Sequence, residues 1–276
     1  MTSKPARDRV PAVVSTGHDQ IATAFAARAG RAALMPYLMG GFPDVATSLR
    51  IGIACADNGA DLVELGIPYS DPLADGPVIH AAGTAALRAG ATPDGVLGVA
   101  ESLARRLPVV LMCYVNLVLA RTPDGFARAA AAAGVSGLIV PDLPLEEAAE
   151  IHDACEAHGI ALVPLVAPTT PDARLAAIGA QASGFVYTVS VVGTTGERAT
   201  DEDGYRAVLD RVKPHAAVPV AIGFGISTPE QAAAAARAGA DGVIVGTRLV
   251  RAAAESADPA AAVGGLVAGL SAGLIR

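Results

Sequence analysis

One unit recurs along this chain from Ala32 to the C-terminus. A short run of aliphatic and β-branched residues is followed by a turn and then by an Ala-rich stretch with helical spacing. Several of these stretches end in Ala-Gly, as at Ala89-Gly90 and Ala133-Gly134, which is typical of a helix C-terminus. Regular alternation of strand and helix specifies parallel strands, because each helix returns the chain to the same edge of the sheet.

The pattern predicts eight strands, and each is almost continuously apolar, as strands covered by helices on both sides are. They are expected at Ala32–Leu38, Asp61–Leu65, Val109–Tyr114, Gly137–Val140, Ala161–Leu165, Gly184–Val189, Val218–Ile222 and Gly242–Val245. Eight strands favour an α/β fold of the single (β/α)8 TIM-barrel type. A doubly wound open sheet is the alternative, but that fold usually needs only about six strands.

The chain length of 276 residues suits one barrel domain, which we expect over residues 18–276. An amphipathic segment, Asp19 to Ala29, precedes the first strand and is expected to form an extra helix that closes the N-terminal face of the barrel. Residues 1–17 are expected to form a disordered tail, because their apolar run, Val10 to Val14, is too short for a signal peptide.

The formal net charge of −7 disfavours a nucleic acid or an anionic membrane as the main partner. No uncharged apolar run reaches 18 residues, so no segment is expected to cross a membrane. The three cysteines, Cys55, Cys113 and Cys155, are widely spaced and odd in number, which predicts buried reduced thiols rather than a disulfide framework. These features predict a cytoplasmic small-molecule enzyme.

Candidate catalytic groups are sought where strands end, because the reactive groups of (β/α)8 barrels lie at the C-terminal strand ends. Glu64 lies within the second strand, and a carboxylate there is costly to bury unless it has a partner or a task. Asp75 follows eleven residues later in a Pro- and Gly-rich loop that is long enough to fold over the mouth. The alternatives are a hydrogen-bonded structural Glu64 and, for Asp71 and Asp75, ordinary turn chemistry.

Three glycine-containing segments follow later strands. Gly223-Phe224-Gly225 comes after the seventh strand, and Gly246-Thr247 comes after the eighth and opens a helix. Loops at these two places form the usual phosphate site of the fold, because bare backbone N–H groups and the helix dipole face the anion. Gly193-Thr194-Thr195-Gly196, after the sixth strand, is expected to be a third phosphate contact or a lid.

The sequence has no suitably placed residues for several other kinds of catalysis. The chain has two lysines, Lys4 in the tail and Lys213 beside Pro214, so no lysine is placed for a Schiff base. No histidine falls at a predicted strand end, which argues against a metal site, and no nucleophile elbow or dinucleotide fingerprint is present. Cleavage or rearrangement of a phosphate ester by Glu and Asp, without cofactor or metal, is the chemistry that remains.

The stretch Glu-Leu-Gly-Ile-Pro-Tyr-Ser-Asp-Pro-Leu-Ala-Asp-Gly-Pro-Val-Ile, from Glu64 to Ile79, resembles the signature of the tryptophan synthase α subunit family. Further segments resemble the family's other motifs in the same order: Pro36-Tyr37, Gly40-Gly41-Phe42-Pro43, Tyr114-Val115-Asn116, Pro141-Asp142-Leu143-Pro144 and Gly223-Phe224-Gly225-Ile226. The resemblance runs from about Phe25 to Leu249.

The resemblance implies a retro-aldol cleavage of indole-3-glycerol phosphate to indole and glyceraldehyde 3-phosphate. Indole then passes to a β subunit, which in this family forms an α2β2 heterotetramer with the α subunit. The family's general acid and base falls on Glu64. The loop aspartate that interacts with the indole nitrogen falls on Asp75.

The resemblance also implies a set of substrate-binding residues. Tyr187 matches an active-site tyrosine that helps to place the glutamate, and Tyr37 matches an aromatic wall of the indole pocket, with Leu111 and Met112 as further walls. Thr195 matches a lid threonine that reaches the loop aspartate. The phosphate contacts carry over to Gly196, Gly225, Gly246 and Thr247.

One departure bears on the partner. After Asn116 the family usually carries a glycine in the loop that approaches the β subunit, whereas this chain reads Leu119-Ala120-Arg121-Thr122-Pro123. Threonine disfavours a positive φ that glycine accepts. A free-standing lyase that releases indole without a β partner is therefore an alternative, and a catalytically silent barrel that binds a phosphometabolite is a third possibility.

Overall fold

A computed structural model describes residues 15–28, 30–189, 202–223 and 225–274. Most of the expected N-terminal tail lies outside these residues. The described chain starts just before helix α1 (Gly17–Ala26), whose first turn is capped by Thr16: its side chain accepts from the Asp19 N–H, and the Asp19 carboxylate accepts in return. This reciprocal pair fixes where the helix begins.

The strands form one parallel sheet. They are β1 (Ala33–Met39), β2 (Val63–Gly66), β3 (Val109–Met112), β4 (Gly137–Ile139), β5 (Ala161–Leu162), β6 (Leu165–Val166), β7 (Val186–Thr188), β8 (Val220–Ile222) and β9 (Gly242–Val245). Their order in space is β5-β4-β3-β2-β1-β9-β8-β7-β6. Each observed strand falls within one residue of the range predicted for it, so the predicted element order is confirmed.

The sheet closes through a single segment, because β5 and β6 are the two halves of the predicted strand Ala161–Leu165. The first half bonds to β4, with the Val163 N–H donating to the Leu138 carbonyl at 2.9 Å. The second half bonds to β7, with the Tyr187 N–H donating to the Pro164 carbonyl at 3.0 Å. Pro164 has no N–H and so cannot continue the first ladder. The predicted (β/α)8 barrel is confirmed, with β5 and β6 sharing one of its eight positions.

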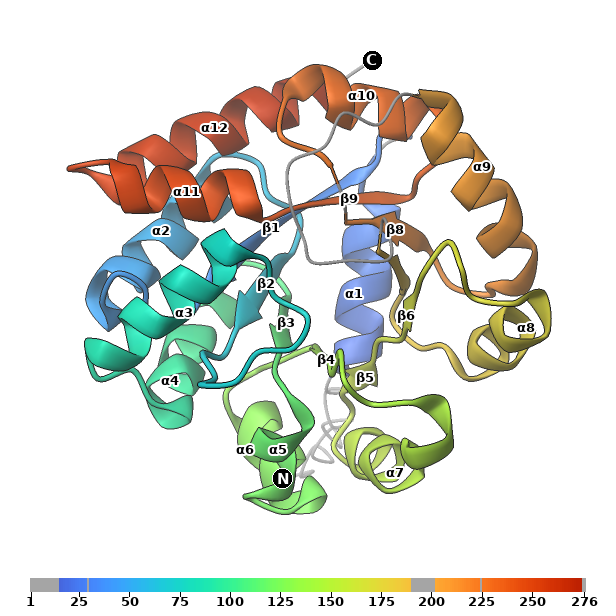
Figure 1. Cartoon of the computed structure of the whole chain (residues 1–276), viewed down its shortest axis with the longest axis horizontal. Helices are drawn as coiled ribbons and strands as arrows, with labels where there is room; N and C mark the ends of the chain where they lie inside the picture. The colour runs from blue at the N-terminus through green and yellow to red at the C-terminus, as the bar shows by residue number, and fades with distance from the viewer. Residues whose placement is uncertain (1–14, 29, 190–201, 224, 275–276) are drawn as a thin grey trace, which may run out of the picture.

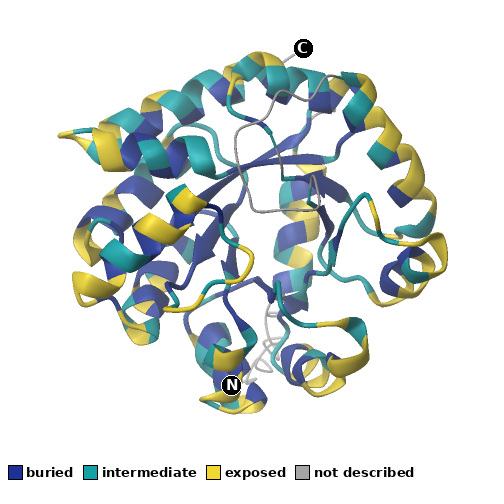
Figure 2. Ribbon diagram, in the orientation of Figure 1, coloured by how far each residue is buried: buried dark blue, intermediate teal, exposed yellow. Residues whose placement is uncertain are grey.

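Helices surround the strands on all sides (Figure 1). They are α2 (Val45–Asp57), α3 (Pro77–Arg88), α4 (Pro93–Ala104), α5 (Val115–Leu119), α6 (Pro123–Ala132), α7 (Ala149–Ala157), α8 (Asp172–Gln181), α9 (Glu202–Val212), α10 (Pro229–Arg237), α11 (Thr247–Glu255) and α12 (Pro259–Leu274), with 3-10 turns η1 (Leu145–Glu147) and η2 (Lys213–His215). The strand residues are buried except for half-buried Met112, Leu162 and Leu165, and the exposed residues lie on the helices and loops (Figure 2).

Helix α1 packs against the N-terminal end of the barrel, as predicted. Ile21 and Phe25 are buried, and a side chain added at Gly137, the first residue of β4, would meet Ile21. One added at Gly242, the first residue of β9, would meet Phe25. The plug therefore excludes water from the bottom of the barrel and leaves the C-terminal strand ends as the open face.

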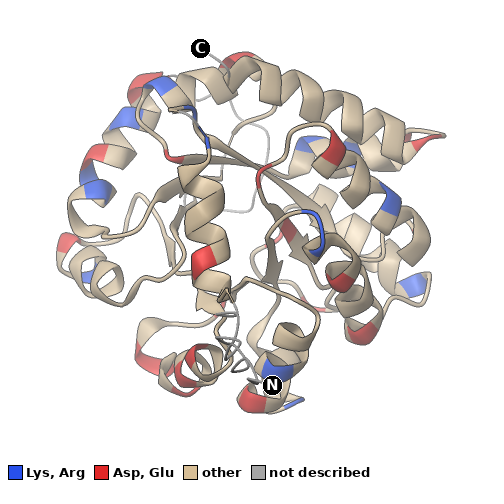
Figure 3. Ribbon diagram, turned by 180° about the vertical axis from the view of Figure 1, so that it is seen from behind, with Lys and Arg blue, Asp and Glu red and all other residues tan. Residues whose placement is uncertain are grey.

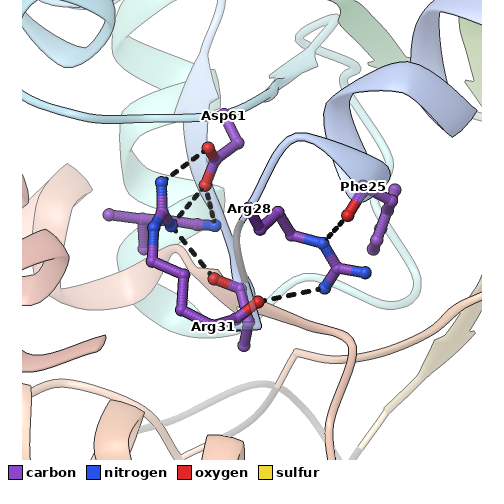
Figure 4. A network of polar contacts seen from close by, with 6 residues as sticks. Phe25, Arg28, Arg31 and Asp61 are labelled. Atoms are coloured by element: carbon purple, nitrogen blue, oxygen red, sulfur yellow. Dashed lines mark hydrogen bonds and ion pairs between the residues drawn. The ribbon is translucent and has the colours of Figure 1, made fainter. Parts of the chain in front are cut away.

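Charged groups hold the segment between α1 and β1 in place (Figure 4). Arg31 donates to both oxygens of Asp61, at 2.7 and 2.8 Å, and Asp61 also accepts from the Leu34 N–H at 2.8 Å. The Arg28 guanidinium donates to the Phe25 carbonyl and lies 4.8 Å from the centre of the Phe25 ring. These contacts anchor the plug to the first strand.

Charged residues of both signs lie mainly on the outer helices and in loops (Figure 3). The predicted burial of the three thiols is confirmed, because Cys55, Cys113 and Cys155 are free and buried. Within the described ranges, no helix is both long and apolar enough to span a bilayer.

Candidate active site

Glu64 points into the barrel. Its register partners are Tyr37 on β1 and Val110 on β3, and Val110 is in turn paired with Gly137, which faces the Ile21 plug. Paired residues of adjacent strands share a face of the sheet, so Glu64 and Tyr37 lie side by side on the inner face. Tyr37 leans toward the C-terminal end of β2, because a Cβ added at Gly66 would lie 2.4 Å from its hydroxyl oxygen.

The environment of Glu64 is that of a proton donor. The side chain is fully buried, and neither carboxylate oxygen has a hydrogen-bond partner among the described residues. Burial, assisted by the negative charge of Asp75, raises the pKa of Glu64 to about 8. The expectation of a functional rather than a hydrogen-bonded structural glutamate therefore gains support from the geometry.

Asp75 lies in the loop between β2 and α3, close enough to Glu64 for its charge to act there. Its Oδ1 accepts a hydrogen bond of 3.0 Å from the Tyr114 hydroxyl, at the end of β3. Partial burial raises the pKa of the Asp75 carboxyl, while the hydrogen bond from Tyr114 lowers it. The loop thus folds back over the mouth, as expected from its length, and brings a second carboxylate to the first.

Tyr187 on β7 completes the group around Glu64. Its ring is buried, and the pKa of its phenol is raised by burial and by the charge of Glu64, which places the two groups near each other. The ring also fills the space beside Gly223, at the end of β8, where an added Cβ would come within 2.0 Å of Cε2. A glycine is therefore required at position 223 because the Tyr187 ring approaches so closely, and not only because the chain turns there.

The structure does not bring Leu111 to this group. Leu111 is paired with Leu65 on β2 and Leu138 on β4, so it lies on the outer face of the sheet, opposite to Glu64. Met112, its neighbour, is paired with Gly66 and faces inward. Of the two walls expected from the sequence, only Met112 is on the face that lines the barrel.

The two glycine segments expected to bind phosphate lie at adjacent strand ends, because Ile222 on β8 is paired with Val243 on β9. Gly225 has a φ of +65°, a conformation that favours glycine. Gly246 is the N-cap of α11, and Thr247 is its first helical residue. Thr195 and Gly196, expected to be a lid and a phosphate contact, lie outside the described residues.

Other groups lie away from the mouth. Lys213 binds Asp241, just before β9, at 3.1 Å and therefore sits at the opposite end of the barrel. In the described ranges, no set of three or more His, Cys, Asp or Glu side chains is arranged to hold a metal ion. A pocket of about 380 Å³ lies between α7 and α8 and includes neither Glu64 nor Asp75 in its walls.

Sequence reasoning gave no role to two residues that shape the site. Tyr114 belongs to one of the family motifs, and a hydroxyl-bearing ring at a C-terminal strand end is itself a signal of a site residue. Asp142, in the motif after β4, accepts from the Val115 N–H at 2.9 Å and thereby ties the loops after β3 and β4 together. Both contacts join distant segments, so no local pattern predicts them.

Comparison with known proteins agrees with this geometry. The family model described as "Tryptophan synthase alpha chain" matches residues 24–266. A tryptophan synthase alpha chain from Prochlorococcus marinus is 49% identical over 241 residues, covering 87% of this chain and 86% of its own. One from Gloeobacter violaceus is 46% identical over 84% of this chain and 86% of its own.

Solved structures give the same result. A chain of Mycobacterium tuberculosis tryptophan synthase superposes with a TM-score of 0.87 at 39% identity, covering 95% of this chain and 100% of its own. The tryptophan synthase subunit alpha from Legionella pneumophila superposes with a TM-score of 0.86 at 34% identity, covering 95% and 99%. By sequence, fold and site, the chain belongs to the tryptophan synthase alpha chain family.

Proposed function

We propose that this chain cleaves indole-3-glycerol phosphate to indole and glyceraldehyde 3-phosphate and passes the indole to a tryptophan synthase β subunit. Membership of the family supports the lyase reaction. The observation that carries the proposal is the carboxylate pair: a buried Glu64 without a hydrogen-bond partner among the described residues faces the charge of Asp75 at the mouth of the barrel.

The pair supplies the proton transfers of a retro-aldol cleavage. Protonated Glu64 donates its proton to C3 of the indole ring, and the positive charge that develops at the ring nitrogen is stabilised by ionised Asp75. The Glu64 carboxylate then takes the proton of the adjacent glycerol hydroxyl. The carbon–carbon bond breaks, its electrons return to the ring, and an aldehyde and indole leave. Glu64 ends protonated, so the cycle needs no cofactor.

The substrate phosphate would lie at the C-terminal ends of β8 and β9, which are separated from β2 by β1. We assign it to the backbone N–H groups at Gly225, Gly246 and Thr247, where the N-terminus of α11 faces the anion. Gly196 is proposed as a further phosphate contact, and Thr195 as the lid threonine that reaches Asp75. Tyr37 and Met112 would line the indole end.

The partner is supported by exposed apolar side chains at the mouth. Leu73, in the loop after β2, is 83% exposed, and Leu119, in the helix after β3, is 52% exposed. Large aliphatic groups so exposed on neighbouring loops suit a surface that a partner covers. The M. tuberculosis neighbour is a chain of a tryptophan synthase, and for this protein we propose the α2β2 assembly that the family resemblance implies.

The loop departure that favours a free-standing lyase falls at a residue with a backbone conformation that glycine prefers. Thr122 stands where the family usually has glycine, yet its φ is +64°, the positive value that a glycine would supply. The loop after β3 therefore keeps a glycine-like path, and the β-coupled role is the one that we propose. The free, buried thiols suit a reducing compartment, so we place the enzyme in the cytoplasm.

The test is indole release from indole-3-glycerol phosphate by the purified chain, alone and with a tryptophan synthase β subunit, beside Glu64→Gln. Slow release alone, acceleration by the β subunit and an inactive variant are expected. Fast release that ignores the β subunit would establish the free-standing lyase instead. Absence of indole under both conditions would leave a silent, ligand-binding barrel, which binding of the substrate without turnover would identify.

A further inference from the structure

The strongest feature that the proposed chemistry leaves unused is the Tyr114 hydroxyl. It accepts from the Ala74 N–H at 3.0 Å and donates to Asp75 Oδ1 at 3.0 Å. A phenol has a single hydroxyl hydrogen, and the Ala74 N–H occupies a lone pair, so this hydrogen is directed to Asp75. The hydroxyl oxygen of Tyr114, just after β3, thereby holds two successive residues of the loop after β2.

The ring that carries this hydroxyl is itself held in place. Tyr114 is buried and stacks on Tyr69, with ring centres 5.2 Å apart and planes inclined by 28°. Tyr69 accepts from the Asn116 amide at 2.8 Å, and the residue after Tyr114, Val115, donates its N–H to Asp142. The phenol is therefore a rigid support, because stacking and backbone bonds restrict its rotation.

The hydrogen bond from Tyr114 engages one carboxylate oxygen of Asp75 and leaves the other available to the substrate. Tyr114 occupies Oδ1, and among the described residues no hydrogen bond is made to Oδ2. A free carboxylate in a loop samples several rotamers, whereas one oxygen fixed by a buried donor limits the positions of the other. The hydrogen bond also opposes the effect of burial on the pKa of Asp75, which favours the ionised form that a cationic ring requires.

We propose that Tyr114 is a positioning residue for the lyase reaction: its hydroxyl fixes Asp75 Oδ1 and the Ala74 backbone, so that Oδ2 is presented, ionised, to the indole N–H. The inference rests on the proposed function, because Asp75 is given its role there. It goes beyond that function because it assigns a role to Tyr114, which follows β3, in placing the carboxylate of Asp75 in the loop after β2.

The experiment compares wild type, Tyr114→Phe, Asp75→Asn and the double variant in the presence of the β subunit. Phenylalanine keeps the ring and its stacking on Tyr69, so the fold should survive. We expect kcat to fall by about tenfold with a smaller change in KM, as for loss of one hydrogen bond to a charged group. The acidic limb of the profile of kcat/KM against pH should move up by about one unit.

The double variant separates positioning from a structural effect. If Tyr114 acts through Asp75, Tyr114→Phe should add almost nothing in the Asp75→Asn background. Tyr69→Phe, which loses only the contact with Asn116, should leave the acidic limb in place. A carbon-13 NMR titration of the Asp75 carboxyl should show the same rise in pKa on Tyr114→Phe, without any reference to turnover.

Two failures remain distinguishable. A wild-type protein that releases no indole would overturn the proposed function and this inference with it. An active wild type whose Tyr114→Phe variant keeps kcat and the acidic limb would overturn the positioning role alone. Multiplying effects in the double variant, with no change in the Asp75 titration, would likewise show that Tyr114 supports the fold rather than Asp75.

Discussion

Tyr37 and Glu64 are register partners on two adjacent parallel strands, and both side chains face the barrel interior. The phenol leans over Gly66 and helps to bury the carboxylate, which stays without a hydrogen-bond partner among the described residues. A carboxyl group in such a place keeps its proton at neutral pH. The geometry thus provides an acid on the inner face of the barrel, with the ionisable Asp75 in the loop over the mouth.

This arrangement predicts a bell-shaped profile of kcat/KM against pH. Activity requires Glu64 protonated and Asp75 ionised, so it should fall as pH rises through about 8 and as pH drops through the raised pKa of Asp75. Indole release measured between pH ~5 and ~9 would show both limbs. Residual activity of Asp75→Asn should lack the acidic limb, and a flat profile up to pH ~9 would contradict the role of Glu64.

Glu64 should also make stability depend on pH. Its folded-state pKa of about 8 lies above the unfolded value of 4.5, so between these values the folded state holds a proton that the unfolded state has released. Wild-type stability therefore falls as pH rises across this window, by up to a few kcal/mol. Glu64→Gln should remove that slope in urea denaturation, whereas Glu150→Gln, at an exposed helix position, should keep it.

Gly223→Ala should impair catalysis from a position that bears no reactive group. The new methyl would come within 2.0 Å of the Tyr187 ring, which must then move away from Glu64. We expect kcat to fall by roughly 10- to 100-fold, because small displacements in a site are costly. Gly98→Ala is the control: nothing lies within 4 Å of the added methyl at this exposed position of α4, so activity should be unchanged and stability slightly increased.

Thr122→Gly should stabilise the protein. A β-branched residue at φ +64° and ψ 147° is strained by about 1–3 kcal/mol, and glycine relieves this while losing one capping hydrogen bond from the Gly125 N–H. Thr92 offers a matched control, because it caps α4 in the same Thr-Pro-Asp-Gly sequence with a φ of −126°. Thr92→Gly should destabilise. Equal effects at both sites in denaturant titrations would exclude the strain.

Leu119→Asp should weaken activation by the β subunit without harming the barrel. Leu119 is 52% exposed on α5, beside the mouth, so a charge is tolerated in the free chain but not in a covered surface. We expect the β-subunit concentration for half-maximal activation to rise about tenfold or more. Leu87→Asp, exposed at the far end of α3, should leave it unchanged. Equal loss at both positions would argue against a docking surface at the mouth.

Local sequence was sufficient for the strand order and for Glu64 as a candidate catalytic residue. The strand ranges follow from hydrophobic runs and the ends of several helices from Ala-Gly pairs, because these signals act over a few residues. Glu64 stands out because a carboxylate is expensive to bury inside a barrel, whereas Asp75 is separated from Asp71 by the family resemblance. The plug formed by α1 was also predictable, since an amphipathic segment before the first strand has one open face to cover.

The tertiary structure decided those side-chain positions and contacts that depend on residues far away in the sequence. Leu111 lies on the outer face because its register with Leu65 is set by hydrogen bonds between strands, and the inward side of an apolar run cannot be read from the run itself. Tyr114 meets Asp75 only because two loops fold to the same edge of the barrel.

The two Thr-Pro-Asp-Gly segments show, within one chain, which features the local sequence determines and which the tertiary structure determines. Four identical residues determine, in both places, a helix that starts at proline and is capped by threonine: α4 after Thr92 and α6 after Thr122. The direction from which the chain enters differs, with φ of −126° at Thr92 and +64° at Thr122. Local side-chain chemistry specifies the cap, whereas the packing of the flanking elements fixes the backbone angle, even against the preference of the residue that bears it.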